Sequence, residues 1–348
     1  MEKNEKITLP PVAEALLGWY AHAARKLPWR ENVTPYRVWV SEIMLQQTRI
    51  EAAKEYFRRF MQALPDVRSL ANAERDTVLK LWEGLGYYSR ARHLHEAARV
   101  ILDEYGGELP ADVKKLRALP GIGDYTAGAI ASIAFGLPEP AVDGNVMRIC
   151  ARLTACPRSI AEPKLKIEFR EQLREQYTRD CGALSSAIME LGETVCVPGT
   201  PDCGRCPLAN VCAAHALGRE TDFPVMPAKK ARRIEPRTVL LLRCGGRTAL
   251  CRRPENGLLA GLWEFVNLAG RMEADAVRAW CAERGLMPRE IRPCGSAVHI
   301  FSHLEWHMEG FCVDCGCAAD GFVWAEDVSA YALPTAMRTY KNVWERQK

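Results

Sequence analysis

A chain of 348 residues exceeds the roughly 250 residues at which single hydrophobic cores stop growing, so we expect two domains. Hydrophobic residues make up 48% and charged residues 26%, which is the balance of a globular protein, and no uncharged apolar run reaches the about 18 residues of a membrane span. The net charge of +4 permits a nucleic-acid partner without requiring one. No apolar signal segment follows the first residues, which favours a cytoplasmic protein.

Two amphipathic helices are predicted near the start of the chain. Residues 12–24 have helical spacing, and a second apolar run begins at Tyr36. On a helix, Glu42 would share one face with Val38 and Leu45. A carboxylate in an apolar stripe is costly unless it is paired or protonated. Burial would raise the pKa of Glu42 and keep a proton on it near neutral pH, which suits a general acid.

Helical patterns continue up to the cysteine-rich region. The next helices are expected at 56–64, 78–85, 93–102, 148–156 and 164–194, with a glycine-rich loop at 84–89. No segment with strand spacing occurs before residue 218. We therefore predict an all-α domain over residues 1–218.

A Pro-Gly-Ile-Gly run at 120–123 separates an amphipathic run ending at Leu119 from a run of small residues at 127–135. This pattern predicts a tight turn between two helices. Gly121 and Gly123 leave backbone N–H groups bare, so a phosphate could approach them closely. The alternative is an ordinary turn in which the glycines serve only a steric need.

Asp143 precedes a further helical run and is a candidate N-cap, whose amide hydrogen bonds and helix dipole would keep it ionised. With Glu42 protonated, the two carboxyls could divide the work of breaking a glycosidic bond through an oxocarbenium-like state. The alternatives are that Glu42 is paired with an arginine such as Arg37 and that Asp143 is only a cap.

Four cysteines then follow within 17 residues, in a C-x6-C-x2-C-x5-C array: Cys196, Cys203, Cys206 and Cys212. Thiolates at this spacing suit zinc or an iron–sulfur cluster, and a reducing compartment keeps them available. Structural zinc usually draws two C-x2-C pairs, and only one is present, which weakens the zinc interpretation.

The composition changes after the cysteines. Residues 219–236, which include Lys229 and Lys230, are polar, basic and proline-bearing, as in a linker. Beyond them we predict an α+β domain over 237–348. Its expected elements are a hairpin (238–243 and 248–252), a helix (274–284), strands (296–301, 304–311 and 322–325) and a final helix (335–345).

The hairpin at 119–123, the later Asp143 and the cysteine array, in this order and spacing, resemble the helix-hairpin-helix DNA glycosylases of the endonuclease III type. Residues 41–48, 84–88 and 142–146 resemble the MutY adenine DNA glycosylases. The resemblance covers nearly the whole chain. It implies two helical lobes with a DNA-binding cleft between them, a [4Fe–4S] cluster on the four cysteines, and a monomer associated with the nucleoid. The implied partner is duplex DNA in which adenine lies opposite 8-oxoguanine or guanine.

The resemblance also implies roles for individual residues. Glu42 would protonate the flipped adenine, Asp143 would stabilise the positive charge at C1′, and Tyr125 and Asn145 would line the pocket. Implied DNA contacts, including the lesion loop of the C-terminal domain, are Arg25, Arg30, Gln47, Thr48, Leu85, Tyr87, Gly121, Gly123, Phe301, Ser302 and His303. For Leu85 and Tyr87 the alternative is that they are plain core residues.

Tyr125 distinguishes two activities within this superfamily. Bifunctional relatives carry a lysine just after the hairpin as the nucleophile for strand cleavage, and this chain has a tyrosine there. We therefore expect a monofunctional glycosylase, in which Lys54 or another lysine could give weak lyase activity. Two other hypotheses remain open: a lyase-type glycosylase for oxidised pyrimidines and a non-catalytic helix-hairpin-helix DNA-binding protein.

The C-terminal domain resembles a Nudix hydrolase fold with a degenerate box. Around residues 278–285 only one of the usual metal-binding carboxylates remains, so hydrolysis of a nucleoside diphosphate is not expected. The histidines at 299, 303 and 307 could equally be spaced strand residues. Relatives often carry basic residues in the loop between the first two array cysteines, but loop 197–202 has none, so Arg205 would have to make the phosphate contact instead. Cys312, Cys315 and Cys317 are expected to be free thiols.

Overall fold

The structure is a computed structural model that describes residues 7–227 and 231–347, so Lys229 and Lys230 of the predicted linker lie outside the described residues. The chain divides into two compact units. One unit comprises residues 1–72 and 93–228, and the other comprises residues 73–92 and 229–348. Within the described residues, none of the helices combines the length and apolar character needed to cross a bilayer.

The helical part of the chain confirms the predicted all-α class. Its helices are α1 (Ala13–Ala23), α2 (Pro35–Leu45), α3 (Ile50–Ala63), α4 (Val67–Asn72), α5 (Arg75–Leu81), α6 (Ser89–Tyr105), α7 (Val113–Ala118), α8 (Asp124–Ala129), α9 (Gly144–Leu153), α10 (Pro163–Arg174), α11 (Cys181–Thr194) and α12 (Ala213–Ala216). A π-helical segment, Ile130–Ala134, continues α8. The short helix α4 was not predicted.

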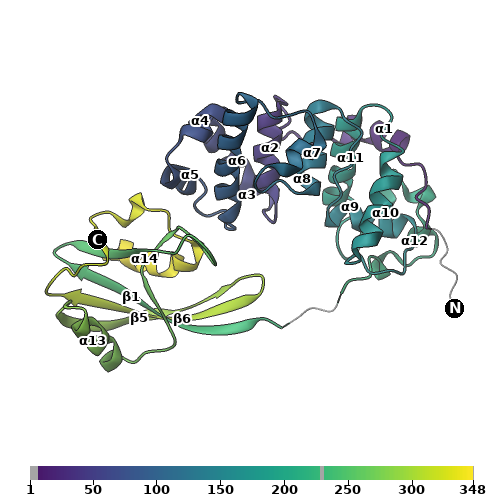
Figure 1. The fold of residues 1–348 in the computed structure, drawn as a ribbon. Coiled ribbons are helices and arrows are strands. Elements are labelled where there is room, and N and C mark those ends of the chain that lie inside the picture. The colour runs from purple at the N-terminus through teal and green to yellow at the C-terminus, as the bar shows by residue number, and fades with distance from the viewer. Residues whose placement is uncertain (1–6, 228–230, 348) are drawn as a thin grey trace. The chain divides into compact units, whose positions relative to one another are not determined.

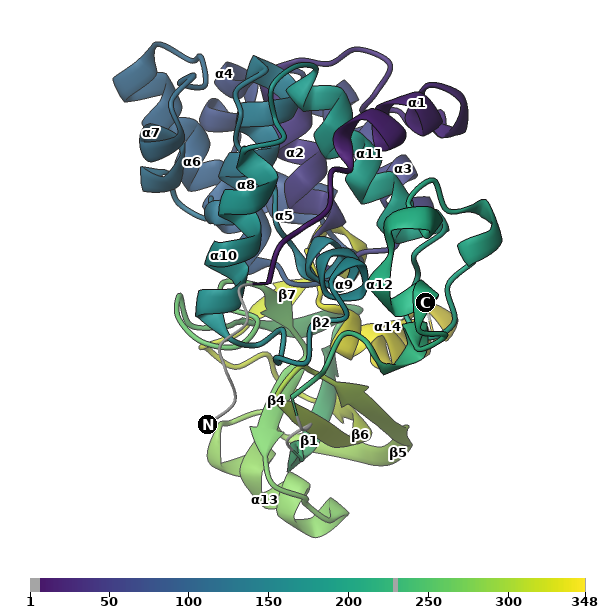
Figure 2. The ribbon, with the colours of Figure 1, turned by 90° about the vertical axis from the view of Figure 1, so that its right-hand side faces the viewer.

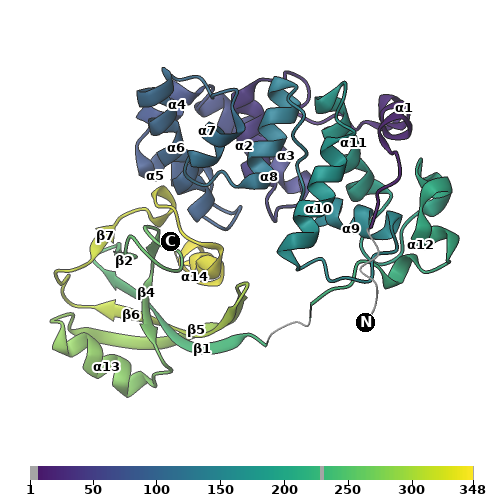
Figure 3. The ribbon, with the colours of Figure 1, turned by 45° about the vertical axis from the view of Figure 1, so that its right-hand side comes forward.

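Local sequence signals explain where two of these helices begin. Thr34 caps α2 by accepting a hydrogen bond from the Arg37 amide at 3.3 Å, and Pro35 occupies the first turn, where its missing N–H costs nothing. Asp112 caps α7 in the same way. Helix α9 contacts α10 and α11 (Figure 3), and α1 lies beside α11 (Figure 2). These helices bury a shared apolar core that includes Leu16 and Phe169.

The C-terminal domain is built on a seven-stranded mixed sheet. Its strands are β1 (Arg233–Cys244), β2 (Arg247–Arg252), β3 (Trp263–Glu264), β4 (Val266–Ala269), β5 (Pro288–Ile300), β6 (Leu304–Cys315) and β7 (Val323–Ala325). Five of them follow the order β3-β2-β1-β6-β5, while β4 pairs with β1 and β7 pairs with β2. Strands β1 and β6 pair in parallel, whereas β5 and β6 form an antiparallel hairpin. The hairpin predicted at 238–243 and 248–252 is confirmed as β1 and β2, and the strands predicted at 296–301 and 304–311 fall within β5 and β6. Strand β1 begins at Arg233, inside the segment predicted as a linker.

Two helices cover opposite faces of this sheet (Figure 1). Val239 and Leu241 share a buried cluster with Tyr340 of α14 (Arg338–Arg346). Leu240 points to the other side, where it packs with Val277 of α13 (Ala274–Glu283). Strand side chains alternate between the two faces, so the continuous apolar run of β1 supplies both cores.

Candidate active site

A cavity of about 1310 Å³ lies within the helical unit. Its walls come from the segment between α1 and α2, from α2 itself, from the 121–126 turn, from the start of α9 and from α11. The cavity brings together ten of the predicted site residues: Arg25, Arg30, Glu42, Gln47, Thr48, Gly121, Gly123, Tyr125, Asp143 and Asn145. Residues as far apart in the chain as Tyr20 and Glu193 therefore meet at one site.

Glu42 is buried on α2, with 6% of its surface exposed. Tyr125 donates a hydrogen bond from its hydroxyl to Glu42 Oε2 at 2.8 Å. The alternative pairing with Arg37 is wrong, because the Arg37 guanidinium donates to the Pro28 carbonyl at 2.8 Å. Burial, with a smaller effect from Asp143, raises the pKa of Glu42 to about 7 against the opposing bond from Tyr125. Glu42 can thus carry a proton near neutral pH.

Tyr125 is the second residue of α8 and is half-buried. Burial, reinforced by the nearby Glu42 and Asp143 carboxyls, raises the pKa of its phenol well above the usual value. The phenol therefore remains protonated and acts as a donor. Its oxygen also lies 3.9 Å from the Met189 sulfur.

Asp143 is the N-cap of α9, as the sequence predicts, and accepts a hydrogen bond from the Val146 amide at 2.8 Å. The expected downward shift of its pKa is wrong. Burial raises the pKa of Asp143, and this effect exceeds the opposing amide bonds from Val146 and Asn145 and the attraction of Arg148. The cavity therefore contains two carboxyls that both resist ionisation.

Glu190 on α11 is a site residue that the sequence reasoning missed. Its side chain is 1% exposed and forms ion pairs with Arg25 (Nε–Oε1, 2.5 Å) and Arg30 (Nη2–Oε2, 2.9 Å). Burial works against ionisation, but the two arginines outweigh it and lower the pKa of Glu190. The signal that identified Glu42, a carboxylate in an apolar helical stripe, applies equally to Glu190.

Further unpredicted groups complete the wall. Asn145 donates from Nδ2 to Glu193 at 3.2 Å, and Glu193 itself lines the cavity. Of the lysines that the structure describes, Lys166 on α10 lines the cavity, whereas Lys54 lies elsewhere and pairs with Glu51 at 2.7 Å. Lys166 is therefore the better candidate for any residual lyase activity.

Packing requires a glycine at one of the two glycine positions of the 120–123 turn and not at the other. Gly121 has a left-handed φ of 73°, and a Cβ there would lie 2.5 Å from the His93 Cβ, so the steric alternative holds for this residue. Gly123 precedes α8 and has open space around its Cα. The turn closes with a hydrogen bond from the Ile122 amide to the Leu119 carbonyl at 3.2 Å. Packing explains Gly121 and leaves Gly123 open to a ligand role.

The other predicted DNA contacts belong to the second unit. Tyr87 is 48% exposed, so the core alternative is wrong for it, whereas Leu85 is buried. Ser302 and His303 are exposed in the loop between β5 and β6, with Ser302 Oγ 3.3 Å from His303 Nδ1. Phe301 packs edge-on against Trp306, which fixes the base of this loop.

The four cysteines of the array line one small cavity, together with Arg152. Arg152 is 3% exposed, donates to Cys196 Sγ at 3.4 Å, and also donates to the Val197 and Gly199 carbonyls at 2.8 and 2.9 Å. A buried guanidinium beside converging sulfurs is suited to neutralising thiolates. The donor set therefore fits an iron–sulfur cluster.

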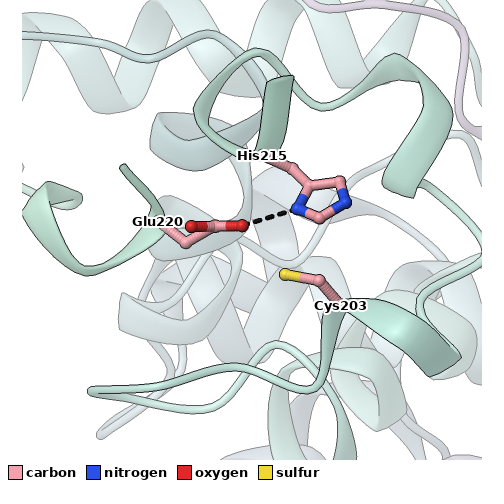
Figure 4. A group of neighbouring side chains, drawn as sticks. All are labelled: Cys203, His215 and Glu220. Atoms are coloured by element: carbon pink, nitrogen blue, oxygen red, sulfur yellow. Dashed lines mark hydrogen bonds and ion pairs between the residues drawn. The ribbon is translucent and has the colours of Figure 1, made fainter. Parts of the chain in front are cut away.

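A histidine and a carboxylate lie beside one of these thiols (Figure 4). The potential ligand atoms of Cys203, His215 and Glu220 all lie within 4.8 Å of one another. His215 Nδ1 and Glu220 Oε1 are already paired at 2.5 Å. Because these two side chains satisfy each other, the four sulfurs remain the more consistent ligand set.

The remaining residues considered from the sequence line neither of these two cavities. Arg205 is exposed and lies 3.6 Å from Asp202. Cys312 and Cys315 are buried on β6, and Cys317 is exposed after it.

Comparisons with known proteins agree with this geometry. Residues 40–175 match the model of the HhH-GPD superfamily base excision DNA repair proteins, and residues 238–342 match a NUDIX domain. The adenine DNA glycosylase of Rattus norvegicus is 33% identical over 96% of this chain and 78% of its own length. That of Buchnera aphidicola is 32% identical over 85% of this chain and 84% of its own length. A solved thermostable thymine-DNA glycosylase superposes on 59% of this chain and 95% of its own, with a TM-score of 0.54 and 25% identity. The chain belongs to the adenine DNA glycosylase family of base excision DNA repair enzymes.

Proposed function

We propose that this glycosylase removes adenine paired with 8-oxoguanine or guanine in duplex DNA, and that it does so as a monomer without a lyase step. The observation that carries the proposal is the buried Glu42, bonded to Tyr125 and sharing one cavity with Asp143. Ligand pockets commonly enclose about 300–1,000 Å³, so the cavity of about 1310 Å³ has room for a flipped nucleoside.

In the proposed reaction, protonated Glu42 donates its proton to adenine, at N7. The bond between adenine and C1′ then breaks, its electron pair leaves with the base, and positive charge develops at C1′. Asp143, in its anionic form, stabilises that charge. The Glu42 carboxylate formed by the first step takes a proton from the attacking water as the water adds to C1′, which restores the acid.

The raised pKa of each carboxyl has a place in this scheme. Glu42 must be protonated before the base leaves, and its pKa of about 7 provides that form near neutral pH. Asp143 must ionise, and the Val146 and Asn145 amides are the groups that favour its anion. Developing positive charge at C1′ would favour that anion further.

Tyr125 supports the monofunctional assignment. A Schiff base needs a neutral amine, and the position after the hairpin instead holds a phenol that is bonded to Glu42. Lys166 lines the cavity and could react slowly with the abasic product. Borohydride trapping of wild type and Lys166→Gln would measure that side reaction: a small amount of trapped product is expected in the wild type and less in the variant.

The DNA contacts follow from the family resemblance and from exposure. Gly123 is open to a phosphate, and Gln47 is exposed at the cavity rim with a left-handed φ of 56°. Tyr87 is proposed to stack beside the lesion, and Ser302 to hydrogen-bond 8-oxoguanine. Arg25 and Arg30, held by Glu190, keep positive charge at the cavity wall.

We also propose that the four array cysteines hold a [4Fe–4S] cluster, supported by their shared cavity and by Arg152. Such a cluster would supply a rigid cross-link between α11 and the segment up to α12. Cys206→Ser should lose iron and visible absorption in the purified protein. Stoichiometric zinc in place of iron in the wild type would contradict this assignment.

The deciding experiment follows adenine release from duplexes that contain adenine opposite 8-oxoguanine, guanine or thymine, with strand breaks scored before and after alkali. Release opposite 8-oxoguanine and guanine, with breaks only after alkali, is expected. Breaks before alkali would show a lyase, and excision of oxidised pyrimidines instead of adenine would support the alternative glycosylase.

A further inference from the structure

The segment 73–92, although it lies between helices of the glycosylase part, packs in one compact unit with the C-terminal domain. It contains α5 and the loop 84–87, which carries Leu85 and the exposed Tyr87. Ion pairs join α5 to the domain, such as Arg75 with Glu255 and Arg252 with Asp76. Exposed ion pairs of this kind add little to stability on their own. The contacts at the ends of the loop are more specific.

Both ends of the loop bond to the backbone of one residue in the C-terminal domain, Leu333. At the first end, Glu83 accepts a hydrogen bond from the Leu333 amide at 3.3 Å and another from Lys341 Nζ at 3.1 Å. At the second end, the Tyr88 hydroxyl donates to the Leu333 carbonyl at 3.3 Å. The same hydroxyl accepts from the Gly84 amide at 3.1 Å, which closes the loop across its base. Tyr88 and Leu333 are each 3% exposed.

The loop between these ends has a defined and unusual backbone. Gly84, Gly86 and Tyr87 all have left-handed φ values, of 101°, 71° and 47°. A non-glycine residue rarely adopts this conformation, so Tyr87 is held there by its surroundings. Arg90 donates to the Leu85 and Gly86 carbonyls at 3.3 and 3.1 Å, and its guanidinium lies 5.6 Å from the centre of the Tyr87 ring.

We propose that Glu83 and Tyr88 are positioning residues, which fix the loop 84–87 to the C-terminal domain through Leu333 and so hold Tyr87 ready to stack on DNA. This inference rests on the proposed function, in which Tyr87 stacks beside the lesion and the same domain recognises 8-oxoguanine. An ordered loop binds more tightly than a mobile one, because the entropy of ordering is already lost before DNA arrives. These contacts of Glu83 and Tyr88 with Leu333, here called the clamp, mean that the domain proposed to recognise the lesion also supports the stacking residue.

The test is a double-mutant cycle on full-length protein, with binding measured by fluorescence anisotropy. The probe is a duplex that carries a tetrahydrofuran abasic-site analogue opposite 8-oxoguanine. Tyr88→Phe removes only the hydroxyl, and loss of its bonds should weaken binding about fivefold. Because Tyr88 acts through Tyr87, the same substitution should have no effect in a Tyr87→Ala background. Lys341→Met, in the C-terminal domain, should weaken binding about twofold by the same route.

Tyr105→Phe, a half-buried tyrosine of α6, is the matched control and should bind as wild type. Thermal unfolding of each variant checks that it folds, and Lys341→Met tests the clamp if Tyr88→Phe does not. The positioning role would be overturned if a folded Tyr88→Phe bound DNA as tightly as wild type. It would also be overturned if Tyr88→Phe weakened binding by the same factor in the Tyr87→Ala background as in wild type. Either result would leave the proposed function intact. Wild-type binding by Tyr87→Ala alone would instead remove the stacking assignment, and the inference with it.

Discussion

Replacing Glu42 by glutamine should stabilise the protein above neutral pH while it removes the catalytic proton. In the folded chain the pKa of this carboxyl is about 7, raised by burial from an ordinary 4.5. Below 4.5 both the folded and unfolded states are protonated, so burial carries no ionisation cost. Between 4.5 and 7 the unfolded state releases the proton and the folded state retains it, so stability falls as pH rises.

The size of the effect follows from the same values. A rise from 4.5 to about 7, at about 1.4 kcal/mol for each pH unit, amounts to about 3 kcal/mol of destabilisation once the pH exceeds 7. Glutamine has nearly the same shape and does not titrate. The difference in unfolding free energy between Glu42→Gln and wild type should therefore grow by about 3 kcal/mol in favour of the variant from about pH 4 to about pH 8.

The assay is denaturant unfolding of full-length protein, followed by helical circular dichroism at a series of pH values. Glu55→Gln on α3 is the matched control, because the Glu55 side chain is 75% exposed, and its stability should run parallel to wild type. A constant difference between Glu42→Gln and wild type over this range would refute the pKa assigned to Glu42. A growing difference that favours the wild type would refute its sign.

Three further outcomes are expected. Asp143→Asn should release adenine at least about a hundredfold more slowly in single-turnover assays, because a neutral amide cannot stabilise the positive charge at C1′. Duplex binding should be retained. Release rates within a factor of three of wild type would exclude this role for Asp143. Glu190→Gln should lower the free energy of unfolding by about 2 kcal/mol in denaturant titrations. Breaking a fully buried ion pair costs roughly 3–5 kcal/mol, and the loss is smaller here because Arg25 and Arg30 reach solvent. Unchanged stability would mean that these ion pairs do not stabilise the fold. Ser302→Ala should reduce the ratio of release rates opposite 8-oxoguanine and opposite guanine by about fivefold, and an unchanged ratio would reject the lesion loop.

Periodic and capped elements could be predicted from the sequence. The apolar stripe around Glu42 and the cap at Asp143 both occur where the local pattern places them. Strands β3 and β4 were not predicted, because two to four residues are too few to show a period.

Tertiary burial is the part that the sequence could not supply. The amides at the start of α9 favour ionised Asp143, as predicted, but the sequence does not reveal how deeply that carboxyl is buried, and burial decides the direction of its pKa. The contact between Glu83 and Leu333 joins residues 250 positions apart, which no local pattern encodes. The ion pairs of Glu190 could not be predicted for the same reason, because Arg25 and Arg30 lie 165 and 160 positions away in sequence.

The pH dependence of adenine release connects the pKa of Glu42 to the reaction. If its protonated form is the acid, the single-turnover rate should fall as the pH rises above about 7.

The most direct test of the central claim is adenine release by Glu42→Gln from a duplex with adenine opposite 8-oxoguanine, measured under single-turnover conditions beside duplex affinity. Release should be lost and affinity retained, since the substitution removes the acidic proton and leaves the cavity shape unchanged. Equal release by variant and wild type would contradict Glu42 as the general acid.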